Sequence, residues 1–273
     1  MMLTDGERRE YEAQGFLVKR DLLSGAECDA LTARISETIA RVGAAEGASG
    51  WPDVPDPDYF RGTARRIGLF WEAGTRPERL PPAERERCVA RLGHGLHFED
   101  DLFRHAACHP RVADVLEGLL APGVNVVQTM VIYKQPRVGG ELGYHQDAAY
   151  LHTEPMTLMS AWMALDEVTE ENSPLLVIPG SHRLPLQSLS EMDAEGRFQE
   201  ERLGDARPDS AAAVPVPVSR GSVIFFHGLL YHGSGPNRSD RPRRAYAVHY
   251  ASAASRWLPT NWIDGTPGFM RVR

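Results

Sequence analysis

The first third of the chain has the hydrophobic pattern of helices. Leu31, Ile35 and Ile39 recur every four residues, so they would form one apolar stripe along a helix. Residues 110–120 repeat this pattern, with valines and leucines on one side. Residues 42–87 lie between these segments and are richer in Gly, Pro, Arg and Glu, which predicts an irregular surface segment.

From residue 124 onward the hydrophobic period changes from helical to two. Residues 124–134 form a long β-branched segment. Further strand-like segments follow, separated by Gly, Pro and Ser turns, at 157–165, 174–178, 214–218, 221–227 and 243–251. Helices followed by many strands predict an α+β, mainly β fold, in which N-terminal helices support a β-sandwich or barrel. Residues 183–213 are polar without strong periodicity, so they form either a flexible lid or a plain surface insertion.

The length of 273 residues fits one domain of this kind. We expect a single domain over residues 1–273, with mostly helical support in 1–123 and the β-barrel core in 124–273. The composition, 42% hydrophobic and 25% charged, is that of an ordinary globular protein. The net charge of −7 argues against nucleic acid as a partner, although a local arginine cluster can still bind an anionic substrate.

The cysteines and the apolar segments bear on where the protein works. Cys28, Cys88 and Cys108 lack the close spacing of a zinc site and indicate reduced thiols. No apolar run reaches the ~20 residues that a membrane span needs, and the first residues lack the features of a signal peptide. We therefore expect a cytoplasmic protein without a membrane partner, as a monomer or weak homodimer.

A candidate metal site lies in residues 139–147, where His145 and Asp147 are two positions apart. In a β-strand such residues point to the same face, about 6.6 Å apart, so an imidazole and a carboxylate can bind one cation. A third ligand must come from elsewhere in the fold. His232 is a candidate because the predicted strand 221–227 ends shortly before it.

Two histidines and one carboxylate favour iron over zinc. On one face of a metal they leave positions open on the other, which suits Fe(II) that must also bind substrate and dioxygen. A zinc site would tend to close four positions or keep a single water. An HxD pair alone is weak evidence, because most such pairs are partly exposed polar residues without a metal.

Arg243 opens the predicted strand 243–251, eleven residues after His232. A planar guanidinium binds both oxygens of a carboxylate. Arg243 therefore suits the far end of a dicarboxylate that chelates iron at its other end. The neighbouring Arg241 and Arg244 are interpreted as solvated charges.

Three side chains of the first long strand share one face, those of Gln128, Met130 and Lys134. If this face lines the barrel interior, its polar groups need partners, because an unpaired buried polar group costs about 1–3 kcal/mol. A bound ligand would supply them. For Lys134 an outward polar face is an equally open interpretation.

These motifs resemble the phytanoyl-CoA dioxygenase family, most closely its branch of phytanoyl-CoA dioxygenase domain-containing proteins. The resemblance runs in order through nearly the whole chain, which makes it far more specific than the HxD pair. The segments that carry it are residues 11–18, 92–97, 127–130, 133–136, 145–147, 153–155, 178–182, 225–237, 243 and 259–262.

The resemblance implies a double-stranded β-helix, a cupin-like jelly-roll barrel with supporting N-terminal helices. It also implies Fe(II) as the metal, with 2-oxoglutarate and dioxygen as cosubstrates. The metal ligands would be His145, Asp147 and His232. Arg243 and Ser234 would grip the far carboxylate of 2-oxoglutarate.

Further positions are implied in the same way. Gln128, Met130 and Trp162 match positions that line the cosubstrate pocket of the family. Arg91 falls where relatives carry a lysine near the cosubstrate, which leaves its role open. Residues 173–174, Ser-Pro, replace a commoner glycine, and we expect this change to alter a turn without affecting the chemistry.

We therefore predict an Fe(II)- and 2-oxoglutarate-dependent dioxygenase that hydroxylates a small molecule or an acyl substrate and releases succinate and CO2. Related halogenases replace the carboxylate ligand by a small residue, so Asp147 favours hydroxylation. Two alternatives stay open: a cosubstrate-independent metal-binding jelly roll and a non-catalytic relative. An acyl-CoA substrate would need a basic entry groove, and Arg61, Arg65 and Arg66 are either that groove or a solvated face.

Overall fold

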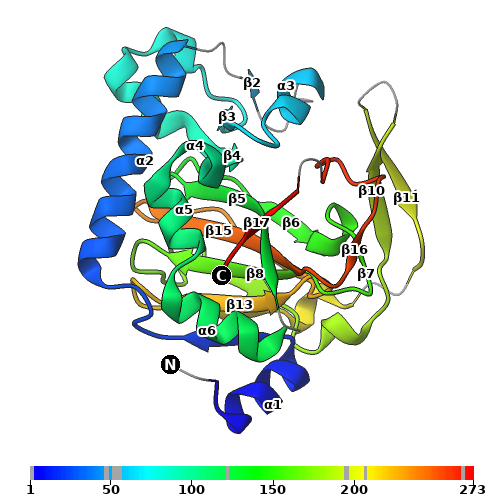
Figure 1. The fold of residues 1–273 in the computed structure, drawn as a ribbon. Helices are drawn as coiled ribbons and strands as arrows, with labels where there is room; N and C mark the ends of the chain where they lie inside the picture. The colour runs from blue at the N-terminus through cyan, green and yellow to red at the C-terminus, as the bar shows by residue number, and fades with distance from the viewer. Residues whose placement is uncertain are drawn as a thin grey trace.

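Two mainly antiparallel β-sheets face one another at the centre of the molecule, and helices cover the outer face of the larger sheet (Figure 1). The structure is a computed structural model that describes residues 3–45, 49–50, 57–120, 123–193, 197–205, 208–265 and 268–273. The predicted mainly β, jelly-roll fold with helical support is confirmed.

The larger sheet contains nine strands among the described residues and has the order β1-β13-β8-β15-β5-β4-β3-β2, with β17 also paired to β5. Its strands are β1 (Phe16–Lys19), β13 (Val223–His227), β8 (Met159–Ala164), β15 (Arg243–Ser252), β5 (Val124–Lys134), β4 (Val89–His94), β3 (Ile67–Trp71), β2 (Ser49–Gly50) and β17 (Met270–Arg271). Its centre, β8-β15-β5, is formed by the predicted strands with small changes at their ends.

The smaller sheet has the order β12-β9-β14-β6, and two further strand pairs lie at its side of the molecule. Its strands are β12 (Val214–Val216), β9 (Leu175–Val177), β14 (His232–Ser234) and β6 (Leu142–His145). The further pairs are β10 (Ser188–Met192) with β11 (Phe198–Arg202), and β7 (Thr153–Glu154) with β16 (Arg256–Trp257).

Six α-helices and five short 3-10 helices complete the described chain. The α-helices are α1 (Asp5–Gln14), α2 (Gly25–Ala45), α3 (Pro57–Gly62), α4 (Leu96–Glu99), α5 (Asp101–Ala107) and α6 (Pro110–Leu119). The 3-10 helices are η1 (Pro77–Arg79), η2 (Pro82–Cys88), η3 (Asp147–Ala149), η4 (Ser181–Arg183) and η5 (Ser210–Ala212).

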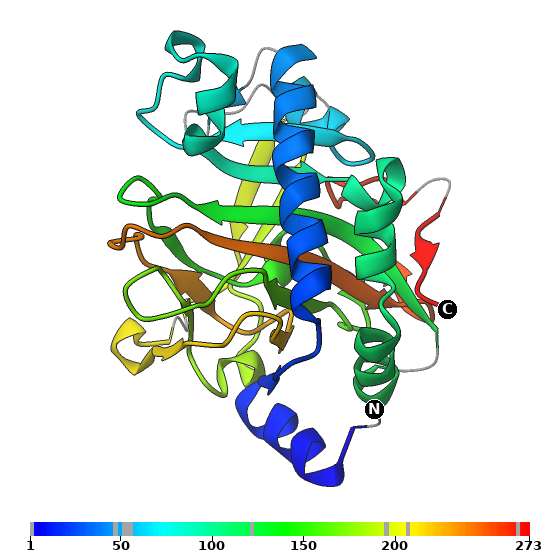
Figure 2. The same cartoon turned by 90° about the vertical axis from the view of Figure 1, so that its left-hand side faces the viewer.

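The long helix α2 lies across the strands of the larger sheet (Figure 2). Its predicted apolar stripe, Leu31, Ile35 and Ile39, is buried in the cluster that separates helices from sheet. Just before the helix, Ser24 accepts a hydrogen bond from the backbone of Glu27, whose carboxylate accepts one from the backbone of Ser24. This reciprocal pairing satisfies the first backbone donors of the helix.

A second hydrophobic cluster fills the space between the two sheets. The larger sheet contributes Trp162, Ile224 and Ala247, and the smaller sheet contributes Leu175 and Val177. Because strand residues alternate between faces, the larger sheet packs one set of side chains on the helices and the other inside the barrel. The interior set carries the candidate site.

Part of the segment expected to be irregular is instead a strand of the larger sheet. Residues 67–71 form β3, which pairs with β4 and is buried along its whole length. Residues 42–87 are predicted to be irregular from their Gly and Pro content, although they include a short apolar run, Ile-Gly-Leu-Phe-Trp. Five buried apolar residues are enough for a strand when both faces are covered.

The polar segment 183–213 contains a β-hairpin. Strands β10 and β11 pair antiparallel, with Ser190 opposite Glu200. The hairpin stands at one side of the barrel, next to the smaller sheet (Figure 1). Whether it moves as a lid stays a prediction.

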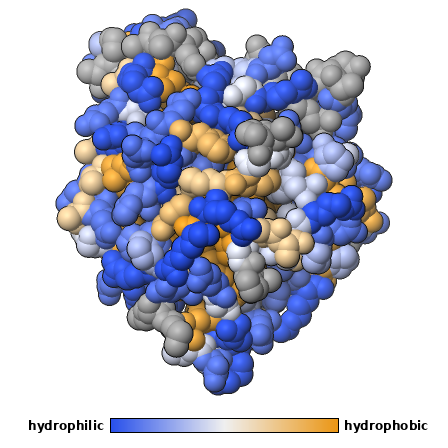
Figure 3. Space-filling model, viewed as in Figure 1, coloured by the Kyte–Doolittle hydropathy of each residue, from blue (hydrophilic) through white to orange (hydrophobic). Residues whose placement is uncertain are grey.

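Hydrophilic residues cover most of the face in Figure 3, with apolar residues in patches between them. In the described part of the chain, no helix combines the length and the apolar character needed to cross a membrane. Tyr150, which follows η3 directly, is one of the few large apolar side chains that are exposed in the described part of the chain.

Gly221 offers a test of how the N-terminal segment is fixed to the barrel. Its φ is +85°, and an added Cβ would lie 2.3 Å from the carbonyl oxygen of Leu23. Gly221→Ala should lower the free energy of unfolding by about 2–4 kcal/mol, since it combines left-handed backbone with a clash against backbone. Urea denaturation measures this change. Gly25→Ala is the control, because its Cβ meets nothing within 4 Å; equal stability of the two variants would contradict the analysis.

Candidate metal centre

The smaller sheet brings two histidines side by side. His145 ends β6 and His232 opens β14, and the two residues are directly paired in the antiparallel register. Their ring centroids lie 4.3 Å apart. The predicted approach of the distal histidine to the HxD motif is therefore present in the structure.

Asp147 reaches the same point from a turn and not from a strand. Strand β6 ends at His145, and Asp147 is the first residue of η3. The expectation that both side chains leave a single strand is therefore wrong in its detail. Gln146 between them keeps an extended backbone, with φ −111° and ψ 126°, so the two side chains still converge.

The hydrogen bonds of the histidines fix which nitrogen faces the centre. Nδ1 of His145 donates to the carbonyl of Gly143, and Nδ1 of His232 donates to the carbonyl of Leu230, both at 2.9 Å. In the neutral rings, Nε2 then carries a lone pair and no proton. Each Nε2 lies 3.5 Å from the same oxygen, Oδ1 of Asp147.

Three electron-rich atoms thus converge, all within 4.8 Å of one another. Lone pairs and a carboxylate oxygen repel at such distances unless a proton or a metal cation lies between them. The fixed Nδ1 partners leave Nε2 available as the ligand atom, which is the usual arrangement of metal-binding histidines. The donor set therefore fits a divalent metal.

Burial and charge set the protonation of these groups. Burial lowers the pKa of His232 to about 4. Burial also acts to lower the pKa of His145, but the hydrogen bond and charge of Asp147 outweigh it and raise that pKa. Burial alone would raise the pKa of Asp147, yet the neighbouring histidines, His232 and His249 foremost, hold it well below its usual value. Asp147 is therefore an anion at neutral pH.

Arg243 is a buried cation on the inner face of the larger sheet. Only 1% of its surface is exposed. Its Nε donates to the carbonyl of Ser173 at 2.9 Å, and its guanidinium carbon lies 5.1 Å from the centre of the Trp162 ring. Nη1 has no hydrogen-bond partner among the described residues. Burial lowers the pKa of Arg243 to about 9.

The acid that would neutralise Arg243 is already used by its neighbour. Asp166 forms two hydrogen bonds with the guanidinium of Arg244, at 2.6 and 2.8 Å, on the opposite face of β15. The expectation that Arg244 is a solvated charge is therefore wrong. Adjacent residues of one strand point to opposite faces, so Arg244 is paired outside the barrel. Inside it, Arg243 has no carboxylate partner in the part of the chain that the structure describes.

Comparison with known proteins agrees with this arrangement. The family model for phytanoyl-CoA dioxygenase (PhyH) matches residues 11–245. The chain belongs to the phytanoyl-CoA dioxygenase family. It is 33% identical to phytanoyl-CoA dioxygenase domain-containing protein 1 of Mus musculus, over 97% of this chain and 96% of that one. The protein of the same name from Danio rerio is 32% identical, with the same coverage.

Solved structures show the same fold at lower identity. The non-heme alpha ketoglutarate dependent epimerase SnoN superposes with a TM-score of 0.69, 20% identity and 98% coverage of both chains. A second structure of SnoN holds Fe3+, alpha ketoglutarate and nogalamycin RO. EctD from S. alaskensis with bound Fe has a TM-score of 0.67 and 22% identity, covering 94% of this chain and 79% of that one. At the level of the phytanoyl-CoA dioxygenase family, the predicted Fe(II), 2-oxoglutarate and dioxygen are confirmed.

The positions that the family likeness assigned to the cosubstrate lie on the inner face. Gln128 is paired with His249, and Met130 with Ala247, across β5 and β15. Trp162 is paired with the same Ala247 from β8. Directly paired residues of antiparallel strands project to one face, so these side chains share the barrel interior. Their contact with 2-oxoglutarate stays a prediction.

Arg91 and Ser234 lie at two sides of this interior. Arg91 points from β4 to the inner face, where Nη1 lies 3.6 Å from the sulfur of Met130 and the guanidinium stacks on Phe70. Ser234 follows His232 by two residues on β14 and is buried. Their proposed role toward the cosubstrate is likewise untested.

Lys134 is buried as well, so the outward-facing alternative is wrong. Its ammonium group donates to the carbonyl of Gly140, and burial lowers its pKa to about 8. The backbone N–H of Gly140 in turn donates to the carboxylate of Glu72. Lys134 therefore fixes the loop before β6 and faces Arg243 across the strand pair.

Ser173 takes part in the site although the sequence suggested a turn without chemical consequence. Its φ is +75°, in the left-handed region that favours glycine. Its carbonyl accepts from Arg243, and its hydroxyl donates to the carbonyl of Gly235 at 2.5 Å. The turn therefore orients the guanidinium of Arg243. This role could not be predicted from the sequence, because the hydrogen bond joins the backbone of Ser173 to a side chain far away in the chain.

Gln146 connects the metal centre to the hairpin of β10 and β11. Its side-chain oxygen accepts from the backbone N–H of Gln187, just before β10, and its nitrogen donates to the carbonyl of Leu229. Tyr150 lies on the same side, with its ring 6.3 Å from that of His145. The predicted insertion thus stands beside the candidate metal ligands.

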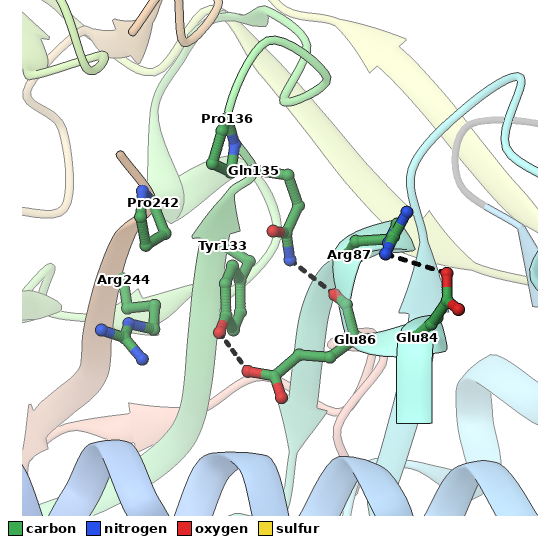
Figure 4. Close-up of a pocket in the computed structure, with 8 residues that line it drawn as sticks. All are labelled: Glu84, Glu86, Arg87, Tyr133, Gln135, Pro136, Pro242 and Arg244. Atoms are coloured by element: carbon green, nitrogen blue, oxygen red, sulfur yellow. Dashed lines mark hydrogen bonds and ion pairs between the residues drawn. The ribbon is translucent and has the colours of Figure 1, made fainter. Parts of the chain in front are cut away.

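A surface cleft of about 370 Å³ lies on the opposite face of the same strands (Figure 4). Tyr133 and Arg244 line it, next to Glu86 and Gln135. Its polar groups are bonded to each other, since Tyr133 donates to the carboxylate of Glu86 and Gln135 to the Glu86 carbonyl. The cleft is therefore separate from the buried site.

The two neighbouring arginines should respond oppositely to substitution. Arg243→Met removes a buried, unpaired charge, so the ligand-free protein should be at least as stable as the wild type. Arg244→Met removes the guanidinium from Asp166, which keeps only the backbone N–H of residue 244, and should cost about 1–3 kcal/mol. Thermal unfolding without added metal or cosubstrate measures both. A larger loss in Arg243→Met than in Arg244→Met would show that Arg243 is a structural residue.

Proposed function

We propose that the chain is an Fe(II)- and 2-oxoglutarate-dependent dioxygenase in which His145, Asp147 and His232 bind the metal. Arg243 would bind the far carboxylate of 2-oxoglutarate. One observation carries the proposal: the barrel holds a converged His–Asp–His cluster together with a buried guanidinium that has no carboxylate partner among the described residues.

The ligand set supports iron. Two imidazole nitrogens and one carboxylate oxygen occupy one face of a metal and leave several positions open. A cosubstrate that chelates through two atoms fills two of these positions, and dioxygen needs one more. A closed structural zinc site would need a fourth protein ligand, and the cluster found in the described residues has three members.

Arg243 supports a dicarboxylate as the cosubstrate. Ser173 accepts from Nε and, at 3.5 Å, from Nη2, which fixes one edge of the guanidinium and leaves Nη1 for a ligand. Along β15 only the methyl groups of Ala245 and Ala247 project to this face between Arg243 and His249. A linear acid would therefore lie over small side chains, with one end at the metal and the other at Arg243.

The bound iron and 2-oxoglutarate would supply the oxidising chemistry, with release of succinate and CO2. The protein binds and orients them and limits the access of water, because the ligands and Arg243 are almost fully buried except for His145. Proton transfer by a separate base is not required for attack on a C–H bond. Hydroxylation of a small molecule is the reaction we propose.

A coenzyme A ester is less favoured as the substrate. Of the arginines considered for a basic entry groove, Arg65 donates to the carbonyls of Asp264 and Gly268 and stacks on Phe98. Arg66 stacks on Tyr59. These contacts use the guanidinium groups for packing, whereas a polyanionic substrate would need them directed toward one groove.

The central test is anaerobic addition of Fe(II) and 2-oxoglutarate, followed by oxygen. The wild type should show the weak metal-to-ligand absorption band and then form succinate. Asp147→Ala should lose metal binding and both signals. Arg243→Met should keep the metal but weaken 2-oxoglutarate binding at least about 30-fold, or ~2 kcal/mol, as expected for a lost buried charge pair.

The exposed neighbour Arg241 provides the control, since Arg241→Met should leave both signals unchanged. Succinate formation that survives in Asp147→Ala and Arg243→Met would refute the proposal. Iron binding without any 2-oxoglutarate turnover, even without substrate, would favour the non-catalytic alternative.

Ala247 tests the path of the cosubstrate. A leucine at this position would project between Met130 and Trp162 and occupy the space over which 2-oxoglutarate should lie. Ala247→Leu should therefore weaken 2-oxoglutarate binding by at least about tenfold, or ~1.4 kcal/mol, while metal binding persists. Val248→Leu, on the opposite face, is the control for overpacking. Calorimetric titration measures both, and unchanged binding in Ala247→Leu would place the cosubstrate elsewhere.

A further inference from the structure

The two oxygens of Asp147 have different surroundings. Oδ1 faces the Nε2 atoms of His145 and His232. Oδ2 accepts two hydrogen bonds, from Oγ of Ser160 at 2.6 Å and from Nε2 of His249 at 3.1 Å. One oxygen is therefore directed at the metal position and the other is held by the larger sheet.

The donors are placed by strand pairing. Ser160 on β8 and His249 on β15 are directly opposite each other, and both are almost fully buried, with 1% and 4% of their surfaces exposed. They lie in the middle of the larger sheet, between β13 and β5. Central strands fix side chains more rigidly than loops do. Asp147 itself lies in a 3-10 turn, which alone would leave its carboxylate free to rotate.

We propose that Ser160 and His249 are positioning residues that restrict Asp147 to binding the metal through Oδ1 alone. This inference rests on the proposed metal site. Turning the carboxylate so that both oxygens bind would break the two hydrogen bonds to Oδ2. It would also leave two buried donors without an acceptor, each at a cost of about 1–3 kcal/mol.

One-oxygen binding has a consequence for the reaction. A carboxylate bound through both oxygens takes two positions on the metal, and with two histidines it would leave only two of six. The cosubstrate and dioxygen together require three. Ser160 and His249 therefore preserve the position at which dioxygen binds, without touching the reacting atoms.

The hydrogen bonds also explain why these polar residues stand inside the barrel. Their cross-strand neighbours one pair further along the same face are Trp162 and Ala247, which are apolar. A serine and a histidine at the centre of a sheet cost desolvation unless they have a partner. Asp147 is the partner of both.

Metal binding measured without cosubstrate tests this proposal. Co(II) is titrated anaerobically into the wild type, Ser160→Ala, His249→Leu and His249→Gln, and the visible absorption bands are recorded. Ser160→Ala should weaken Co(II) binding about tenfold and His249→Leu about 10–100-fold, the range for lost partners of metal ligands. In both variants the position and shape of the bands should change, because the second carboxylate oxygen replaces a bound water. His249→Gln keeps an N–H donor and should restore most of the affinity.

His109 offers a matched control. It is a buried histidine whose Nε2 bonds to the carboxylate of Glu27 at 3.0 Å, on the helical side of the protein. His109→Gln should leave Co(II) binding unchanged even if stability falls. Circular dichroism checks that each variant is folded. Should His249→Leu fail to fold, the result for Ser160→Ala alone tests the proposal, because this substitution removes only one oxygen atom.

The outcomes separate this inference from the proposed function. Wild-type affinity and unchanged bands in Ser160→Ala would overturn the role of Ser160 and His249, whatever the enzyme does with 2-oxoglutarate. A wild type that binds Co(II) but never turns over 2-oxoglutarate would overturn the proposed function. In that case the positioning role is still judged by the variants.

Discussion

Two opposite charges are buried in one barrel and kept from neutralising each other. If Asp147 and Arg243 were in contact, they would form an ion pair. Neither charge would then be available to bind a ligand. They are held apart because other groups bind each of them: Ser160 and His249 hold the carboxylate, and Ser173 holds the guanidinium. Isolated buried charges are costly, so the separation favours ligands that complete both halves, a cation at one end and an anion at the other.

The layers of the fold make this separation possible. A buried guanidinium without a carboxylate partner among the described residues needs a large apolar core elsewhere, and the cluster between helices and sheet supplies it. The same strands serve both purposes, because one face carries the core and the other the site. The adjacent residues Arg243 and Arg244 of β15 illustrate this division. Arg243 lies inside and is bonded to the uncharged Ser173, whereas Arg244 lies outside and is bonded to Asp166.

The sequence predicted those parts of the site that depend on spacing or on strand parity. His145, Asp147 and Arg243 could be found because motifs and alternation act over a few residues, and the family likeness added His232 with more certainty than pattern alone. Ser160 and His249 were missed, although His249 shares the parity of Arg243. Their role depends on which strands are neighbours, and register between β8 and β15 is a long-range property. Ser173 was misjudged for the same reason, since its contact joins distant segments.

The segment beside the site can vary while the buried charged groups, Asp147 and Arg243, stay in place. The charged groups depend on the larger sheet and on the turn at Ser173. The hairpin of β10 and β11 is instead attached through Gln146, between the two candidate metal ligands of the HxD motif. A hairpin of polar residues can change in length and sequence at little cost to the core. Its position beside η3, next to Tyr150, nevertheless places any change close to the candidate metal site.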